Sequence, residues 1–72
     1  MIRVTVLVQG RLARRASTDP EGQIIEMPEG SRVRDLLSIT GLIEEEVRHI
    51  AVNGRQKRLD SALRPRDFVE FG

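Results

Sequence analysis

The chain has 72 residues, no cysteine, and 12 basic against 11 acidic side chains, for a net charge of +1. A chain this short forms one domain, spanning residues 1–72, with a small core. The lack of cysteine excludes disulfides, thiol chemistry and cysteine-bound zinc. A secreted protein this small usually carries disulfides, so we expect a cytoplasmic protein. No apolar run approaches the roughly 20 residues that span a bilayer, so we expect no membrane contact. The balanced charge gives no long-range field that would attract nucleic acid.

The first half of the chain predicts two strands joined by a long connection. From Ile2 to Val8, β-branched apolar residues alternate with their neighbours, which is the pattern of a half-buried strand. Residues 10–22 are polar and too numerous for a tight hairpin, so we expect a mobile loop there, with a helical turn at Leu12-Ala13. Residues 23–27 form the second strand, which Pro28 ends because proline has no amide hydrogen to donate.

An amphipathic helix should follow. Val33, Leu36 and Leu37 are spaced at i, i+3 and i+4 and form one apolar stripe. Ser31 is the expected N-cap, and Gly41 is the expected residue beyond the helix end, where a left-handed conformation closes the last turn. A helix of about ten residues is too short to be stable alone in water, so it must pack on a sheet.

The second half predicts a further helical turn and three more strands. Ile43 and Val47 are spaced for one turn, and Asn53-Gly54 is a strong hairpin signal because both positions tolerate positive φ. The elements expected here are, in order, the turn at 43–47, a strand at 49–52, the Asn53-Gly54 hairpin, a return strand at 55–59, a turn at 64–67 and a last strand at 68–71.

Together these elements predict an α+β fold, a β-grasp in which a four- to five-stranded mixed sheet packs on one main helix. From the known β-grasp arrangement, rather than from the spacing, we expect the last strand to pair with the first at the centre of the sheet. The expected core consists of Val4, Val6, Ile25, Met27, Val33, Leu36, Leu37, either Ile50 or Ala51, Val52, Leu59, Leu63, Val69 and Phe71.

Motifs that carry chemistry are missing from the sequence. No glycine-rich phosphate loop is present, and no serine lies in a nucleophile-elbow context. The single histidine, His49, begins a strand and has no partner of catalytic type nearby in the sequence. The acidic run at 44–46 points in three directions on a helical turn, which favours a solvated turn over a metal site. We therefore expect no catalytic residue, no metal, no cofactor and no enzyme activity.

Two surfaces remain as candidates for binding. One is a basic patch formed by Arg11, Arg14 and Arg15 in the long connection and by Arg55, Lys57 and Arg58 around the hairpin. Phosphate binding needs such clusters, but nucleic-acid readers usually add aromatic residues for stacking, so we favour solvated charges and consider nucleic acid an improbable partner. The other is the outer sheet face, where Leu7 and Phe68 would lie side by side unless the long loop covers them.

Several segments resemble the ubiquitin-like β-grasp sulfur carriers of the MoaD/ThiS type. The matching motifs are residues 27–37 with Gly41 after them, residues 51–54, and residues 63–71. The resemblance covers nearly the whole chain and is weakest at residues 10–22. It implies a carrier whose C-terminal glycine is adenylated by an ATP-dependent activating enzyme and converted to a thiocarboxylate. The thiocarboxylate then donates sulfur to an acceptor enzyme in molybdopterin, tungstopterin, thiamine or related synthesis. The implied reactive residue is Gly72, and the docking candidates are Leu7, Phe68 and Arg66.

The sequence departs from this family at its last residues. The family ends in a flexible Gly-Gly tail, whereas here Phe71-Gly72 directly follows the expected last strand. Gly72 reaches a partner only if that strand frays, because one extended residue spans at most about 3.5 Å. We expect one of three explanations: a truncated tail, a terminus produced by processing or ligation, or a member that has lost conjugation and acts as a docking domain. Arg66 also replaces the glycine usual in the turn before the last strand.

A second family of β-grasp domains, the TGS type found in RNA-associated regulators, is also similar. It shares the Pro-Glu-Gly segment before the helix and the Val-Asn-Gly hairpin, and it needs no terminal glycines. Its first strand usually runs quickly into the second, whereas residues 10–22 intervene here, which favours the sulfur-carrier type. The alternative function is therefore a non-catalytic interaction module that binds protein or RNA.

Overall fold

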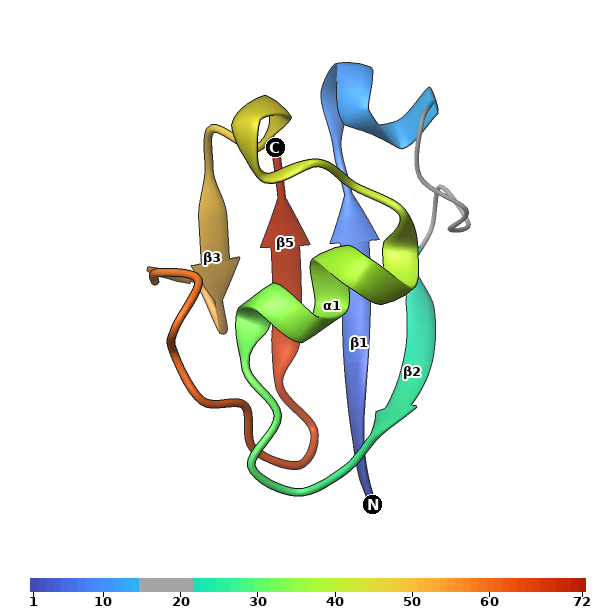
Figure 1. Ribbon diagram of the computed structural model, residues 1–72, viewed down its shortest axis with the longest axis vertical. Helices are drawn as coiled ribbons and strands as arrows, with labels where there is room; N and C mark the ends of the chain where they lie inside the picture. Colours follow the sequence, from blue (N-terminus) through green and yellow to red (C-terminus); the bar gives the residue numbers. More distant parts are fainter. Residues whose placement is uncertain (15–21) are drawn as a thin grey trace.

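The computed structural model describes residues 1–14 and 22–72, with the side chain of Arg14 excepted, and shows one α-helix lying across a mixed sheet (Figure 1). The strands are β1 (Ile2–Val8), β2 (Gln23–Met27), β3 (Ile50–Val52), β4 (Arg55–Gln56) and β5 (Phe68–Phe71). The helical elements are the 3₁₀ turns η1 (Gly10–Arg14) and η2 (Glu44–Glu46) and the α-helix α1 (Val33–Thr40).

The strand order is β2-β1-β5-β3-β4, with β5 parallel to β1 and every other neighbouring pair antiparallel. The last and first strands therefore pair at the centre of a five-stranded mixed sheet, as expected for a ubiquitin-like β-grasp. This arrangement confirms the α+β prediction. It also means that residues from both ends of the sequence form the middle of both sheet faces.

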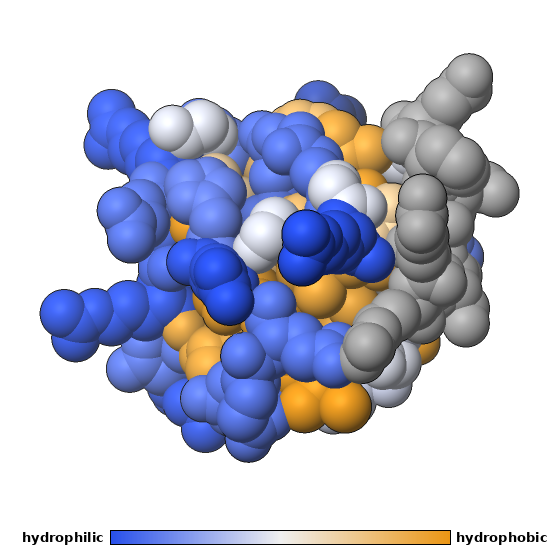
Figure 2. All heavy atoms as spheres, turned by 90° about the horizontal axis from the view of Figure 1, so that it is seen from above, coloured by the Kyte–Doolittle hydropathy of each residue, from blue (hydrophilic) through white to orange (hydrophobic). Residues whose placement is uncertain are grey.

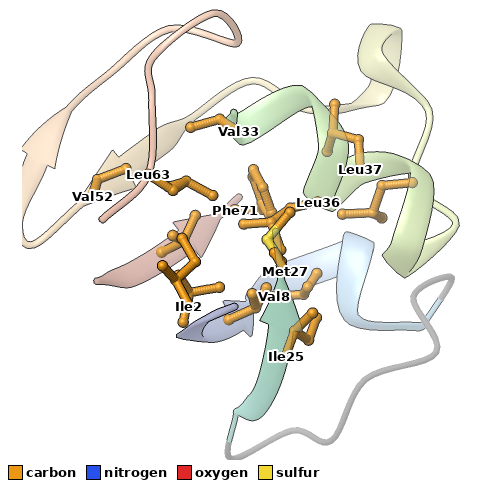
Figure 3. Close-up of a cluster of buried hydrophobic side chains, with 14 of the residues drawn as sticks. Ile2, Val8, Ile25, Met27, Val33, Leu36, Leu37, Val52, Leu63 and Phe71 are labelled. Atoms are coloured by element: carbon orange, nitrogen blue, oxygen red, sulfur yellow. The ribbon is translucent and has the colours of Figure 1, made fainter. Parts of the chain in front are cut away.

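The core lies between α1 and the sheet. Phe71, Leu36 and Met27 point toward one another in this layer, and each is almost fully buried (Figure 3). Burying one such side chain contributes roughly 1.5–3 kcal/mol relative to leaving it exposed. The expected core is largely confirmed, and Ile2, Val8, Leu12 and Leu42 are also part of it.

Three details of the core differ from or refine the prediction. Leu59 is only partly buried and packs at the margin of the cluster. Ile50 also packs against the cluster, because it is paired with Phe71 and shares its face. Ala51 is buried on the opposite face, where it pairs with Glu70.

The predicted helix cap is wrong. Ser31 does not cap α1, because its hydroxyl donates to the carbonyl of Pro28 at 2.7 Å. Arg32 is the N-cap, and its backbone N–H donates to the Asp35 carboxylate at 2.8 Å. The first helical amides, those of Val33 and Arg34, instead donate to backbone carbonyls of the segment 59–61. The helix start is thus stabilised by a distant loop, and the helix has eight residues.

The predicted helix end and hairpin are confirmed. Gly41 has a φ of 77° and ends α1 in the left-handed conformation, with Leu42 packing back into the core. Asn53 and Gly54 have φ values of 55° and 81°, as a two-residue hairpin with both positions left-handed requires. The return strand is shorter than expected, since β4 comprises two residues. Within the loop predicted to be mobile at 10–22, residues 10–14 form η1, and residues 15–21 lie outside the described part of the chain.

Candidate functional site

The sheet face opposite α1 is the first candidate site. Alternation along β1 and β5 places Thr5, Leu7, Phe68 and Glu70 on this face. Phe68 is 37% exposed and Leu7 is partly exposed. Two of the three predicted docking residues, Leu7 and Phe68, therefore lie on the outer face. Their offset differs from the prediction, because Phe68 is directly opposite Thr5 and Leu7 is directly opposite Glu70. Leu7 and Phe68 are diagonal neighbours rather than a direct pair.

Ile24 extends this apolar surface and was not among the predicted docking residues. It is opposite Thr5 in the β1–β2 ladder, so Ile24, Thr5 and Phe68 form one row across three neighbouring strands. Ile24 is 67% exposed, which is the largest exposed fraction among the aliphatic residues of the described strands. The sequence indicated this outward orientation, because Ile24 lies on the opposite face of its strand from Ile25 and Met27, which are buried. We call Ile24, Thr5, Leu7 and Phe68 the outer patch.

Polar side chains border the outer patch. The Gln9 amide donates to the Glu70 carboxylate at 2.9 Å. On the other side, Arg3 and Glu26 form an ion pair at 3.2 Å between largely exposed side chains. Such exposed pairs contribute little to stability, so this one is better placed to set the specificity of a contact than to hold the fold together.

A hydrogen-bonded network fixes the start of β5 and therefore the position of Phe68. The Asp67 carboxylate, which is largely buried, accepts hydrogen bonds from the Asn53 side-chain amide at 2.8 Å and from the Arg64 backbone N–H at 2.9 Å. The Asn53 side-chain oxygen accepts the Phe68 N–H at 2.9 Å. The hairpin turn and the turn before β5 are thereby joined beneath the exposed phenylalanine.

Arg66 is exposed and has an unusual backbone conformation. Its φ is 69°, in the left-handed region that disfavours residues with a Cβ, and its N–H donates to the carbonyl of Arg3 at 2.7 Å. A non-glycine residue held in this region costs of order 1–3 kcal/mol and often marks a functional position. The conformation explains why glycine is usual at this position in the sulfur carriers that the sequence resembles, and Arg66 places a cation two residues before Phe68.

The second candidate site is the end of β5, where Gly72 lies between η1 and η2 (Figure 1). An open groove of about 800 Å³ adjoins it, with Gln9, Arg11, Leu12, Glu45, Arg48 and Gly72 in its lining. Figure 2 views this end of the molecule and shows hydrophilic side chains gathered over it, with hydrophobic surface between them. His49, for which the sequence suggested no catalytic role, lies next to Gly72. A Cβ atom added to Gly72 would lie 3.9 Å from the Cβ atom of His49.

Among the predicted basic residues that the structure describes, Arg11 lies apart from the other three. Arg11 belongs to η1, which follows β1, whereas Arg55, Lys57 and Arg58 lie in or after β4 at the edge of the sheet, with β5 and β3 between β1 and β4. The Arg14 side chain and Arg15 lie outside the described part of the structure. Of the four basic candidates whose side chains the structure describes, Arg11 alone lines the groove beside Gly72.

No group of three or more His, Cys, Asp or Glu side chains within residues 1–14 and 22–72 is arranged to hold a metal ion. No helix in the same part of the chain is long and apolar enough to cross a bilayer.

Comparison with known proteins identifies the family. No family model and no curated protein matches the sequence. Among solved structures, the chain is similar to a protein from Pyrococcus furiosus described as "putative molybdopterin converting factor, subunit 1". The identity is 32% and the TM-score 0.76, and the match covers 99% of this chain and 95% of the other. This chain belongs to the MoaD-type family.

Membership of the MoaD-type family agrees with the sequence resemblance and with the fold. Members of this family are small β-grasp sulfur carriers, and the match spans both candidate sites, since it leaves almost none of the chain uncovered. It also favours the sulfur-carrier type over the TGS type, the second family that the sequence suggested.

Proposed function

We propose that this protein is a sulfur carrier that is activated on a C-terminal glycine and delivers sulfur for the synthesis of a molybdopterin- or tungstopterin-type cofactor. The observation that carries the proposal is the match, over nearly the full length of both chains, to a protein described as a molybdopterin converting factor subunit. Gly72, or a glycine in residues that follow it, is the reactive position. Thiamine synthesis, which uses carriers of the same fold, is the alternative pathway.

The chemistry needs only a carboxylate from the carrier. An oxygen of the glycine carboxylate forms a bond to the α-phosphorus of ATP, and pyrophosphate leaves. A hydrosulfide-type sulfur then attacks the acyl carbon, AMP leaves, and the glycine carries a thiocarboxylate. Transfer of that sulfur to an acceptor, with water supplying oxygen, restores the carboxylate. Glycine suits this role because a terminus without a side chain enters a narrow active site.

The partners are an ATP-dependent adenylating enzyme and a sulfur-acceptor enzyme. The carrier itself is not an enzyme in this proposal, and it needs no cofactor of its own because the activating partner binds the ATP. The outer patch is the docking surface, since it is apolar, solvent-facing and bordered by charged groups. Arg66 adds a cation for an acidic group of the partner. The reaction takes place in the cytoplasm.

Intact-mass measurement tests the proposal. The protein is incubated with ATP, a MoaD-family adenylating enzyme and sulfide, and the expected result is the mass increase of one oxygen-to-sulfur exchange. Where Gly72 itself is the reactive position, Gly72→Val is the matched control: a Cβ at Gly72 makes only ordinary contact with His49, so the variant should fold but not be modified. If the native full-length protein gains no mass, the carrier function is wrong and the outer patch instead supports the alternative, a docking module.

A further inference from the structure

Gly72 is held in the sheet rather than projecting from it. Its N–H donates to the His49 carbonyl at 2.9 Å, and its oxygen accepts the backbone N–H groups of Arg48 and His49, each at 2.9 Å. The preceding carbonyl, that of Phe71, accepts the Gln9 N–H at 2.8 Å. On the side of β3, Gly72 therefore makes the backbone hydrogen bonds of a paired strand residue.

The turn η2 orients the two donors that meet at the Gly72 oxygen. Glu46 and Val47 close this turn by donating to the carbonyls of Ile43 and Glu44, at 3.0 and 3.1 Å. Val47 then leaves it in an extended conformation, with φ −87° and ψ 115°. The next two N–H groups, those of Arg48 and His49, converge on one oxygen. When that oxygen belongs to a carboxylate, hydrogen bonds of this kind are about twice as strong as neutral ones.

We propose that Val47–His49 act as a retaining segment, which keeps Gly72 in the sheet and has to release it before the glycine can be activated. This inference rests on the proposed function. A carboxylate oxygen that accepts two N–H groups is a poor nucleophile toward the α-phosphorus, and a glycine paired along its backbone with Arg48 and His49 cannot at the same time enter a partner's active site. Only the released fraction of molecules reacts, so retention lowers the apparent rate by that fraction.

The groove between η1 and η2 gives a partner access to the retained residue. Gly72 is part of its lining, together with Arg11 and Arg48 of positive charge and Glu45 of negative charge. A partner segment that enters the groove and competes for the Gly72 oxygen would favour the released state. Activation would then occur on the bound carrier, while the free carrier keeps its glycine protected.

Hydrogen exchange measured by NMR tests the retention without any partner. Arg48→Pro removes one donor to the Gly72 oxygen, and the extended backbone of Val47 is compatible with a following proline. Arg48→Ala is the matched control, since it removes the side chain and keeps the N–H. We expect Arg48→Pro to raise the exchange rate of the Gly72 amide by about five- to tenfold, and Arg48→Ala to leave it near the wild-type rate.

The exchange of a core amide, that of Val69, shows whether the variant remains folded. If Arg48→Pro disturbs the core, a protein with an ester in place of the Arg48–His49 peptide bond, made by chemical ligation, removes the His49 donor instead. Equal Gly72 exchange in a folded donor-deficient protein and the wild type would overturn the inference.

A second readout is the initial rate of pyrophosphate release with ATP and a MoaD-family adenylating enzyme. We expect Arg48→Pro to react faster than both Arg48→Ala and the wild type, and to reach the same final extent. Faster Gly72 exchange with an unchanged rate of pyrophosphate release would overturn the role of the retaining segment in activation. If no variant is adenylated while exchange responds as expected, the proposed function fails and retention of Gly72 stays supported.

Discussion

The side-chain amide of Asn53 donates a 2.8 Å hydrogen bond to the carboxylate of Asp67, fourteen residues later in the chain. This contact joins the β3–β4 hairpin to the turn before β5. The same carboxylate also accepts the Arg64 N–H. One largely buried acidic group therefore determines how two turns meet below Phe68, and the outer patch depends on it.

Removing that group should destabilise the protein. In Asp67→Ala, the Asn53 amide and the Arg64 N–H both lose their acceptor, and we expect the free energy of unfolding to fall by roughly 2–3 kcal/mol. Urea denaturation followed by circular dichroism measures the change. The control is Asp60→Ala, at an exposed position, which should stay within about 0.5 kcal/mol of the wild type. Equal stability of the two variants would contradict the assigned role of Asp67.

Arg66→Gly should stabilise the fold and weaken docking. Glycine adopts the observed φ of 69° without the steric cost that arginine has there, and the net gain should be roughly 0.5–1 kcal/mol after the greater chain entropy of glycine is subtracted. Thermal unfolding and titration with the adenylating enzyme measure the two effects. Arg64→Gly is the comparison, because Arg64 has no positive φ. A variant that is both more stable and fully competent in binding would show that Arg66 takes no part in docking.

The apolar stripe of α1 should be essential for folding. Leu36 is fully buried, and Leu36→Ala should cost roughly 2.7–5 kcal/mol, a large share of the stability of a domain this small. Ile39, on the same helix but 52% exposed, provides the control, and Ile39→Ala should have an effect below about 0.5 kcal/mol. The denaturation midpoints of both variants measure these two changes in stability. Similar midpoints would mean that α1 is not pressed onto the sheet as described.

Substitutions in the outer patch should weaken partner binding without unfolding the protein. Phe68→Ala and Ile24→Ser remove exposed apolar area, and each should raise the Kd for the adenylating enzyme by about tenfold, or roughly 1.4 kcal/mol. Ile43→Ser is the matched control, because Ile43 is also half exposed but lies between α1 and η2, away from the patch. Calorimetric titration distinguishes them, and an equal loss of affinity at Ile43 would place the docking surface elsewhere.

The sequence predicted best the elements whose signal is local. The strands at 2–8, 23–27 and 68–71 match the structure residue for residue, because apolar residues recur at every second position in them. The prediction that Ser31 caps the helix was wrong. The segment 59–61, distant in sequence, supplies the acceptors for the first helical amides, and the Ser31 hydroxyl donates to the Pro28 carbonyl instead. No local pattern contains that information.

In the candidate sites, too, the features that depend on local sequence could be predicted and those that depend on distant pairing could not. The outward direction of Leu7 and Phe68 follows from alternation alone, and so does that of Ile24. Their offset depends on the register between β1 and β5, which forms only when the ends of the chain meet. The pairing of Gly72 with His49 likewise depends on the register of β3 against β5, so no spacing in the sequence pointed to that histidine.

The parallel pairing of β1 with β5 has a consequence for biosynthesis. The two central strands come from opposite ends of the sequence, so a nascent chain on the ribosome cannot close its sheet until residue 71 has left the exit tunnel. Closure of the sheet is then dominated by contacts distant in sequence, which favours slow folding for a domain this small. A premature stop shortly before residue 68 would remove an interior strand rather than an edge strand, and the product should be degraded rather than accumulate as a shortened carrier.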